Sequence, residues 1–594
     1  MADNKTPSTN AEQLITEHLD IWTTAIEQKS SSGRGSSKKF SLHGIKKLRE
    51  LILELAVRGK LVPQDPNDEP VSVLLERIAA EKEQLVKEKK IKKPKVLPEI
   101  SEDEKLFELP ESWNWVRLNT VADYNGRPNM APEQINKTTW LLDLEDIEKD
   151  TSKLIYRAQY SERESKSNKS TFQKGDVLYG KLRPYLNKVL IADSDGVCTT
   201  EIVAIVPSKA IQAEYLRCLL KSPSFISYVS SLMYGVKMPR LGTQDAICSI
   251  HPLAPINEQK RIVAKVEELM SLCDALEAQT ENSIAAHQTL VEVLLEALLK
   301  TPEQGATAEQ AAEQFQQNWQ RLSKHFDTLF TTTASIDTLK QTILQLAVMG
   351  KLVPQNPNDE PAAKLLERIA AEKSQLIKDK KIKKQKPLPA ITEEKKPFEL
   401  PSGWEWCRLP DLGELARGKS KHRPRNDPKL YKNGTIPLVQ TGDVARSVEV
   451  IETYTAMYNE VGLAQSQLWP KGTLCITIAA NIADTGILGF DACFPDSVVG
   501  YTCFEPQIPT KYFDYFIRTA KANLEKFAPS TAQKNINLEI LSQVLVPCPP
   551  LEEFERVVNK VDVLLTLCDQ LKARLTDEQT TKLHLTDAIV ELAL

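Results

Sequence analysis

A stretch of 71 residues occurs twice in this chain, and the repeat constrains the architecture more than any other feature. The copies run from Leu48 to Leu118 and from Leu339 to Leu409, 291 residues apart without a gap, and 48 of the 71 positions are identical. Solenoid repeats have periods of roughly 20–50 residues, far shorter than this one. The sequence therefore predicts two similar halves, in which each framework copy precedes a large segment of its own.

A heptad pattern follows each of these large segments. The positions step by 4, 3, 4 and 3 residues, as in a coiled-coil seam; they are Ile262, Val266, Leu269, Cys273 and Leu276 in the first half, and Val557, Val561, Leu564, Cys568 and Leu571 in the second. The chain closes on IVELAL (589–594), which resembles ILELAV (52–57) in the first framework copy. The order framework, globe, helix is therefore cyclic and predicts a pseudo-two-fold relation between the halves.

Local patterns predict the elements within this plan. Leu48, Leu51, Ile52 and Leu55 have helical spacing and Gly59 can end that helix, while Val71 to Lys93 reads as a second helix with a basic tail, KEKKIKKPK. That tail is interpreted as a solvated helix end, with DNA phosphate contact as the alternative. Apolar β-type runs at 176–179, 189–192 and 201–206 and one helix over 214–232 predict a mixed α+β globe. The helix after Pro255 would be capped by Asn257, and a second amphipathic run at 290–299 follows it.

These patterns divide the chain into seven segments. We expect an N-terminal helix and flexible Ser/Gly-rich linker (1–47), the first framework copy (48–118), the first globe (119–255), spacer helices (256–338), the second framework copy (339–409), the second globe (410–550) and a C-terminal spacer helix (551–594).

Bulk properties exclude several classes of protein. A hydrophobic content of 41% and a charged content of 26% are ordinary for a globular protein. No apolar run approaches the ~20 residues that span a bilayer, and the N-terminus lacks the pattern of a secretory signal. The ten cysteines include no C-x-x-C pair, which predicts a reducing, cytoplasmic location and argues against structural zinc. A net charge of −4 leaves DNA binding open, because phosphate contact needs only a local basic surface.

The search for catalytic motifs finds no complete active site. GELARGKS (413–420) formally fits the phosphate-binding P-loop, but Pro424 and Pro428 forbid the helix that such a loop requires. The sequence has no dinucleotide-binding glycine pattern after a strand, no nucleophile elbow and no H-E-x-x-H zinc motif. We therefore predict neither a catalytic residue nor a metal site.

Residues suited to DNA contact are better represented. Arginine and lysine bind phosphates or guanine, and glutamine and asparagine can read adenine, whereas the plain alternative for each residue is a solvated loop. The candidates lie in short clusters in both globes: Lys181, Arg183, Tyr185, Lys188, Lys237 and Arg240 in the first, and Arg417, Lys419, Lys421, Arg423, Gln440, Thr441, Asn481, Gln533, Lys534 and Asn535 in the second.

The whole chain resembles the specificity subunits of Type I restriction-modification enzymes. The cyclic plan carries the resemblance, together with GDVLYGKLRPYLNK, PLAPINEQKRIVAKVEEL, IPLVQTGDV and STAQKNIN. The LAVxGKLVPQ runs most resemble the IB branch of the family.

The resemblance implies two target recognition domains, each reading one part of a split, asymmetric DNA site through the major groove. Long helices would pair as an antiparallel, coiled-coil spacer between them. It also implies no catalysis and no cofactor in this chain. S-adenosylmethionine would bind two methylation subunits that flip the target adenine, and ATP and Mg²⁺ would serve the restriction subunits.

Two rival hypotheses remain at this point. A stand-alone DNA methyltransferase or nuclease would turn over without other subunits. A protein-only coiled-coil adaptor would show no sequence-dependent retention of DNA.

Overall fold

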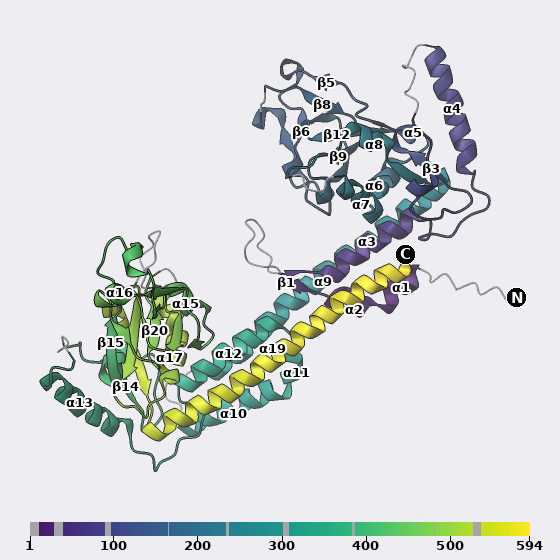
Figure 1. Ribbon diagram of the computed structural model, residues 1–594. Helices are drawn as coiled ribbons and strands as arrows, with labels where there is room; N and C mark the ends of the chain where they lie inside the picture. The colour runs from purple at the N-terminus through teal and green to yellow at the C-terminus, as the bar shows by residue number, and fades with distance from the viewer. Residues whose placement is uncertain are drawn as a thin grey trace. The chain divides into compact units, whose positions relative to one another are not determined.

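The computed structural model describes residues 11–28, 40–88, 97–163, 166–232, 237–300, 308–382, 387–479, 482–526 and 536–594. These residues form two compact units, Met1–Ser283 with Glu578–Leu594, and Ile284–Asp577. Each unit holds one framework copy, one globe and parts of both long helices (Figure 1). The Ser/Gly-rich tract at 29–39 and most of the basic tail at 89–96 lie outside the described residues.

The frame of the first unit is helical. It comprises α1 (Ala11–Glu17), α2 (Leu19–Thr24), the short hairpin of β1 (Glu27–Gln28) and β2 (Phe40–Ser41), α3 (His43–Val57), α4 (Val71–Lys87), and the first part of α9 (Ile256–Leu299). The α3 helix ends where sequence predicted, at Gly59 with φ +69°, a left-handed conformation that glycine adopts without strain. A Cβ at this position would also lie 2.6 Å from Pro110 Cγ, so the close approach of the chain requires glycine.

The frame of the second unit has a matching set of helices. It comprises α10 (Ala308–Lys324), α11 (Phe326–Leu329), α12 (Thr333–Val348), α13 (Ala362–Lys378) and most of α19 (Leu551–Ala593). Gly350 again has φ +69° and lies against a proline, Pro401. The helical part of the repeat therefore folds in the same way twice.

Ion pairs show the direction in which the frame helices pack. Arg49 of α3 contacts Asp274 and Glu277 near the middle of α9, and Asp68, beyond α3, contacts Arg261 near the start of α9. The α3 helix therefore runs antiparallel to α9. In the second unit, Lys340 pairs with Asp569 and Asp337 with Lys572, so α12 runs antiparallel to α19.

The heptad positions face these packed surfaces. Ile262, Val266, Leu269 and Cys273 are buried on α9, and Leu276 is half-buried. On α19, Val557, Val561 and Cys568 are buried within the same apolar cluster as Ile336 and Ile343 of α12. The seam predicted from the 4, 3, 4, 3 spacing is thus a real packing face in each unit.

The predicted N-cap of α9 was wrong, and the predicted amphipathic run at 290–299 is part of the same helix. Asn257 does not cap α9, because the helix begins at Ile256 and the Pro255 carbonyl already accepts a hydrogen bond from the Gln259 N–H at 2.9 Å. The run at 290–299 is not separate, since α9 continues unbroken through a segment without glycine or proline.

The first globe contains two sheets. One is ordered β10-β9-β12-β4, the other β5-β8-β11-β6-β7, and a separate pair, β3 with β13, closes the base. Their bounds are β3 (Asn114–Arg117), β4 (Ala122–Tyr124), β5 (Asn129–Met130), β6 (Trp140–Leu142), β7 (Ala158–Gln159), β8 (Lys169–Phe172), β9 (Val177–Gly180), β10 (Val189–Ile191), β11 (Gly196–Cys198), β12 (Ile202–Pro207) and β13 (Ile250–Leu253).

Helices of the first globe pack on the first sheet. They are α5 (Leu118–Val121), α6 (Ala213–Lys221), α7 (Pro223–Ser231) and α8 (Thr243–Cys248). The single helix predicted over 214–232 is therefore two helices. The physical reason is local: Pro223 occupies the first position of α7, and the Ser222 hydroxyl accepts a hydrogen bond from the Phe225 N–H at 3.3 Å.

The second globe repeats this topology although its sequence differs. Its sheets are ordered β15-β23-β20-β21-β17 and β18-β16-β22-β19, with β14 paired to β24 at the base. The bounds are β14 (Glu405–Arg408), β15 (Gly413–Arg417), β16 (Ile436–Leu438), β17 (Val450–Ile451), β18 (Ala456–Tyr458), β19 (Leu468–Trp469), β20 (Leu474–Thr477), β21 (Thr485–Leu488), β22 (Ala492–Cys493), β23 (Val498–Cys503) and β24 (Leu545–Cys548). Its helices are α14 (Leu409–Leu412), α15 (Thr441–Arg446), α16 (Glu460–Ala464), α17 (Thr510–Lys526) and α18 (Leu538–Gln543).

The order β4-β12-β9-β10 in the first globe thus corresponds to β15-β23-β20-β21 in the second, and β8-β11-β6-β7 corresponds to β19-β22-β16-β18. In both globes the central pair of the second sheet, β11 with β6 and β22 with β16, is parallel. The two globes are therefore two versions of one α+β fold, mounted on equivalent frames.

A buried histidine distinguishes the base of the first globe. His251 on β13 is 2% exposed, packs 5.2 Å from the Phe225 ring, and lies 2.9 Å from the Ser249 hydroxyl through Nε2. Burial lowers its pKa to about 4. The corresponding strand of the second globe carries Val546.

The buried His251 side chain should make the first unit less stable at acidic pH. A folded-state pKa below the unfolded value of about 6.5 means that the unfolded state binds the proton more tightly, so stability is full above pH 6.5 and is lost as the pH falls towards 4. At pH 5 the loss is about 2 kcal/mol. Thermal unfolding measured between pH 7 and pH 5 should show this loss of stability, and the His251→Val variant should not show it. Equal acid sensitivity in that variant would contradict the assignment.

Candidate nucleic-acid interface

Chain direction brings the predicted loops of the first globe to one end of its first sheet. Because β9 and β12 are antiparallel, the loop after β9 and the residues before β12 meet at the same edge. The Lys181 N–H donates to the Glu201 carbonyl at 3.0 Å there. We call this edge the loop end of the globe.

The second basic loop joins the first through main-chain pairing. Leu182 forms a β-bridge with Arg240, and the Arg183 N–H donates to the Pro239 carbonyl at 2.8 Å. Arg183 has a left-handed backbone with φ 49°, which turns the chain sharply before a short 3-10 turn. The structure therefore places Lys181, Arg183, Tyr185 and Lys237 in one region, although over 50 residues separate the two loops.

The six predicted residues of this end divide into two kinds. Arg183, Tyr185 and Lys237 are exposed, and Lys181 is half-buried. Arg240 and Lys188 have partners within the globe. Arg240 forms a two-point ion pair with Glu201 at 2.9 and 3.0 Å, which raises the pKa of the guanidinium and lowers the pKa of the carboxyl.

Lys188 donates through Nζ to the Leu144 carbonyl at 2.7 Å, and burial lowers its pKa. The bonds of Lys188 and Arg240 fix the loops in place, and Arg183, Tyr185 and Lys237 are left exposed on them.

Sequence reasoning missed Asp143 at this end. The parallel strands β6 and β11 end at the same edge, where the Thr199 N–H donates to the Leu142 carbonyl at 3.1 Å. Asp143 follows β6 directly and is half-buried beside the Lys188 loop. In the sequence, Asp143 is marked only as the polar residue that ends the apolar run WLLD. Its place beside the basic loops follows from the strand order of the sheet, which the sequence does not reveal.

The second globe gathers its candidates at the equivalent end. Arg417 is the last residue of β15, and the Gly418 N–H donates to the Val498 carbonyl at 2.9 Å. The segment that follows carries no α-helix, as the two prolines predicted, and Lys419, Lys421 and Arg423 are exposed on it. An ion pair of Arg425 with Asp496 at 2.7 Å ties this basic segment to the loop between β22 and β23.

Gln440 and Thr441 lie at the same end. Strands β16 and β22 are parallel, and the Val439 N–H donates to the Cys493 carbonyl at 2.9 Å just past both strands. The next residues of the β22 loop reach Gly418, where a Cβ would lie 2.4 Å from the Pro495 carbonyl. Gln440 is exposed and Thr441 is half-buried.

Four further candidates, Asn481, Gln533, Lys534 and Asn535, lie outside the described residues. Ile536, the first described residue after Asn535, lies at the loop end, since its N–H donates to the Ile478 carbonyl at 2.9 Å just beyond β20.

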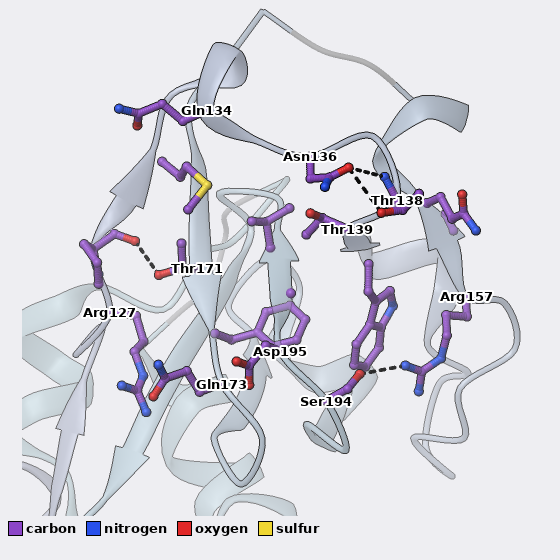
Figure 2. Close-up of a pocket in the computed structure, with 18 residues that line it drawn as sticks. Arg127, Gln134, Asn136, Thr138, Thr139, Arg157, Thr171, Gln173, Ser194 and Asp195 are labelled. Atoms are coloured by element: carbon purple, nitrogen blue, oxygen red, sulfur yellow. Dashed lines mark hydrogen bonds between the residues drawn. The ribbon is translucent and has the colours of Figure 1, made fainter.

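A hollow of about 780 Å³ lies at the opposite end of the second sheet of the first globe (Figure 2). Its rim carries uncharged polar side chains, among them Gln134, Asn136 and Gln173. Its two arginines already have acidic partners: Arg127 pairs with Asp176 and Arg157 with Asp193. The hollow therefore lacks the free positive charge that phosphate contact requires, in contrast to the loop end.

Across the described ranges, no group of three or more histidine, cysteine, aspartate or glutamate side chains is arranged to hold a metal ion. No helix in the described part of the chain has the length and apolar character needed to cross a membrane.

Comparison with known proteins decides the family. Residues 401–579 match the Type I restriction modification DNA specificity domain. The chain is 40% identical to the EcoAI specificity subunit of Escherichia coli, an alignment covering 98% of this chain and 100% of that protein. This chain belongs to the specificity subunits of Type I restriction enzymes. The EcoEI specificity subunit of Escherichia coli is likewise 40% identical, over 98% of this chain and 99% of that protein.

A crystal structure of the HsdS subunit from Thermoanaerobacter tengcongensis also aligns with this specificity subunit. It is 19% identical, covers 82% of this chain and 98% of that one, and has a TM-score of 0.42. Membership of the family confirms a DNA-specificity role without catalysis, because the catalytic activities of Type I systems lie on other subunits.

The geometry predicts which basic residues contact phosphate. Each phosphate contact contributes about 0.9 to the slope of log K against log salt, so Arg183→Gln with Lys237→Gln should lower that slope by roughly 2 in the assembled complex. Fluorescence anisotropy with duplex DNA across a salt series measures it.

Arg157→Gln, which removes an arginine at the opposite end of the same globe, is the matched control and should leave the slope unchanged. Equal slopes for the double variant and the wild-type chain would contradict the placement of the interface.

Proposed function

We propose that this specificity subunit reads a bipartite, asymmetric DNA sequence, with one globe for each half. One observation carries the proposal: two globes of the same strand order stand on equivalent frames, yet present different side chains at equivalent loop ends. A frame repeated with 48 identities in 71 positions keeps the attachment constant. Different loop ends would then recognise different base sequences.

The loop ends supply both kinds of contact that sequence recognition needs. Exposed arginine and lysine side chains suit phosphate contacts, and Gln440 and Thr441 suit base edges. Hydrogen bonds among the loops hold the backbone that carries these side chains in place, which reduces the conformational entropy lost when DNA binds. The sixteen residues predicted from the sequence remain our candidates for this interface.

The repeated frame also supports a partner that binds twice. Glu69 with Arg77 at the α4 helix, and Glu360 with Arg368 at α13, form the same exposed ion pair in both units. Two equal surfaces suit two methylation subunits, which would carry S-adenosylmethionine. Restriction subunits, with ATP and Mg²⁺, would complete the enzyme in the cytoplasm.

Two finer assignments belong to this proposal. The LAVxGKLVPQ run at the end of α3 and again at the end of α12 supports membership of the IB branch. The antiparallel packing of α3 with α9 and of α12 with α19 supports a rigid helical spacer between two target recognition domains at 119–255 and 410–550.

Exchange of one globe tests the proposal. Residues 119–255 are replaced by the aligned segment of the EcoAI specificity subunit, the complex is assembled with its methylation subunits, and methylated adenines are mapped on genomic DNA. Only one half of the recognised sequence should change, because the second globe and the frame are retained. The reciprocal exchange of residues 410–550 should change only the other half. A change of both halves by either exchange would contradict the two-reader arrangement.

A further inference from the structure

We propose that Asp143 and Gln440 are equivalent base-reading positions, with Asp143 accepting a hydrogen bond from the amino group of a cytosine and Gln440 bonding the edge of an adenine. The inference rests on the proposed function and assigns base contacts within it. Asp143 is not among the residues predicted from the sequence. Gln440 is among them, and the inference assigns it a contact with one base.

Strand order makes the two positions equivalent. Asp143 follows β6 and Gln440 comes two residues after β16, and these strands occupy the same place in their sheets, each parallel to the strand beside it. At the adjacent strand ends, the Thr199 N–H and the Val439 N–H each donate across the parallel pair. Both positions therefore open onto the loop end of their globe.

The same pair of hydrogen bonds holds both backbones. The Asp143 N–H donates to Asp146 Oδ2 at 2.9 Å, and the Asp146 N–H returns to the Asp143 carbonyl at 3.1 Å. In the second globe the Gln440 N–H donates to Asp443 Oδ2 at 2.8 Å, and the Asp443 N–H returns to the Gln440 carbonyl at 3.0 Å.

Asp146 and Asp443 are 2% and 4% exposed, and each pairs with an arginine: Arg163 at 2.8 Å from Asp146, and Arg446 beside Asp443. Charged partners and burial make this support stiff. The side chain at each reading position is thus presented from a fixed point, which base recognition requires.

The chemistry of Asp143 points to a base and not to a phosphate. An ionised carboxylate can only accept hydrogen bonds, and the negative charge of a phosphate repels it. Glu201 at the same end is compensated by Arg240. Within the described ranges, Asp143 forms no ion pair. Its Oδ1 accepts from the Leu144 N–H at 2.6 Å and from Thr199 Oγ1 at 3.5 Å. Cytosine presents its N4 amino group as a donor in the major groove, which such an oxygen can accept.

The chemistry of Gln440 points to adenine. Its side chain is exposed at the loop end of the second globe. An amide carries one donor and one acceptor in the geometry that matches N7 and N6 of adenine. Equivalent positions with acceptor-only and donor–acceptor side chains would give the two globes different base preferences.

Isosteric substitutions test both assignments in the assembled methylation complex. Asp143→Asn keeps an oxygen for the Leu144 N–H but adds a donor, and Gln440→Glu removes the amide donor. Each should lower discrimination at a single base of a single half-site by roughly 10- to 100-fold, measured as adenine methylation of a duplex library randomised at every recognised position.

Two substitutions at exposed sites serve as matched controls. Glu133→Gln changes a charge before β6, at the end of that strand away from Asp143, and Gln507→Glu changes an amide beyond the other end of β23. Both should keep the wild-type base preference at every position.

Every outcome bears on the inference. Loss of discrimination for cytosine in the first half-site by Asp143→Asn, and for adenine in the second by Gln440→Glu, supports it. Unchanged preferences contradict it, as does an equal loss of methylation at all sequences, because a reader of one base affects discrimination at that base alone. Methylation of the same library by the wild-type complex separates the two proposals. A recognised sequence without two halves overturns the proposed function. A bipartite sequence, with base preferences that are unchanged in both variants, overturns only this inference.

Discussion

Each globe is joined to its long helix through a buried glutamate that hydrogen-bonds a tryptophan of the repeat, and the rest of the structure depends on this joint. Trp113 donates through Nε1 to Glu258 at 2.9 Å, and Trp404 donates to Glu553 at 3.0 Å. Burial raises the pKa of both carboxyls, although the tryptophan bonds oppose that shift. A framework glutamine also binds each joint, Gln64 on Glu258 and Gln355 on Trp404.

This joint explains why so much of the repeat is invariant between the halves. The tryptophan, the glutamine, the glycine at the end of the frame helix and the aspartate that pairs with the long helix all lie within the 71 residues. Substitution of any of these residues would leave a buried polar group without its partner or create a clash with a proline. Each such change should lower the folding stability by roughly 1–3 kcal/mol. The loop ends carry no such constraint, so the two globes can differ there without loss of the fold.

The sequence predicted the plan of the molecule because its strongest signals are local or repeated. The duplicated framework, the 4, 3, 4, 3 seam, the ends of α3 and α12 at Gly59 and Gly350, and the β-runs of the first globe all appear in the structure. The sequence did not predict that α9 is one unbroken helix, because the segment between its heptad positions and the run at 290–299 lacks apolar periodicity. The break at Pro223 was missed because a proline at the first position of a helix starts one as readily as it ends one.

The interface was harder to predict, because residue type does not reveal a partner. Lys188 and Arg240 were chosen for their charge, yet one bonds a main-chain carbonyl and the other Glu201, contacts that depend on long-range folding. Asp143 escaped notice because an acidic residue is not expected on a surface that is proposed to contact DNA. Only the parallel pairing of β6 with β11 places it among the basic loops.

Duplication of one globe tests most directly whether each globe reads its own half-site through a common frame. In such a chain, residues 410–550 also replace residues 119–255, and adenine methylation by the assembled complex is mapped across a genome. The account predicts a recognised sequence made of two copies of one half-sequence. Retention of the original asymmetric sequence would contradict it.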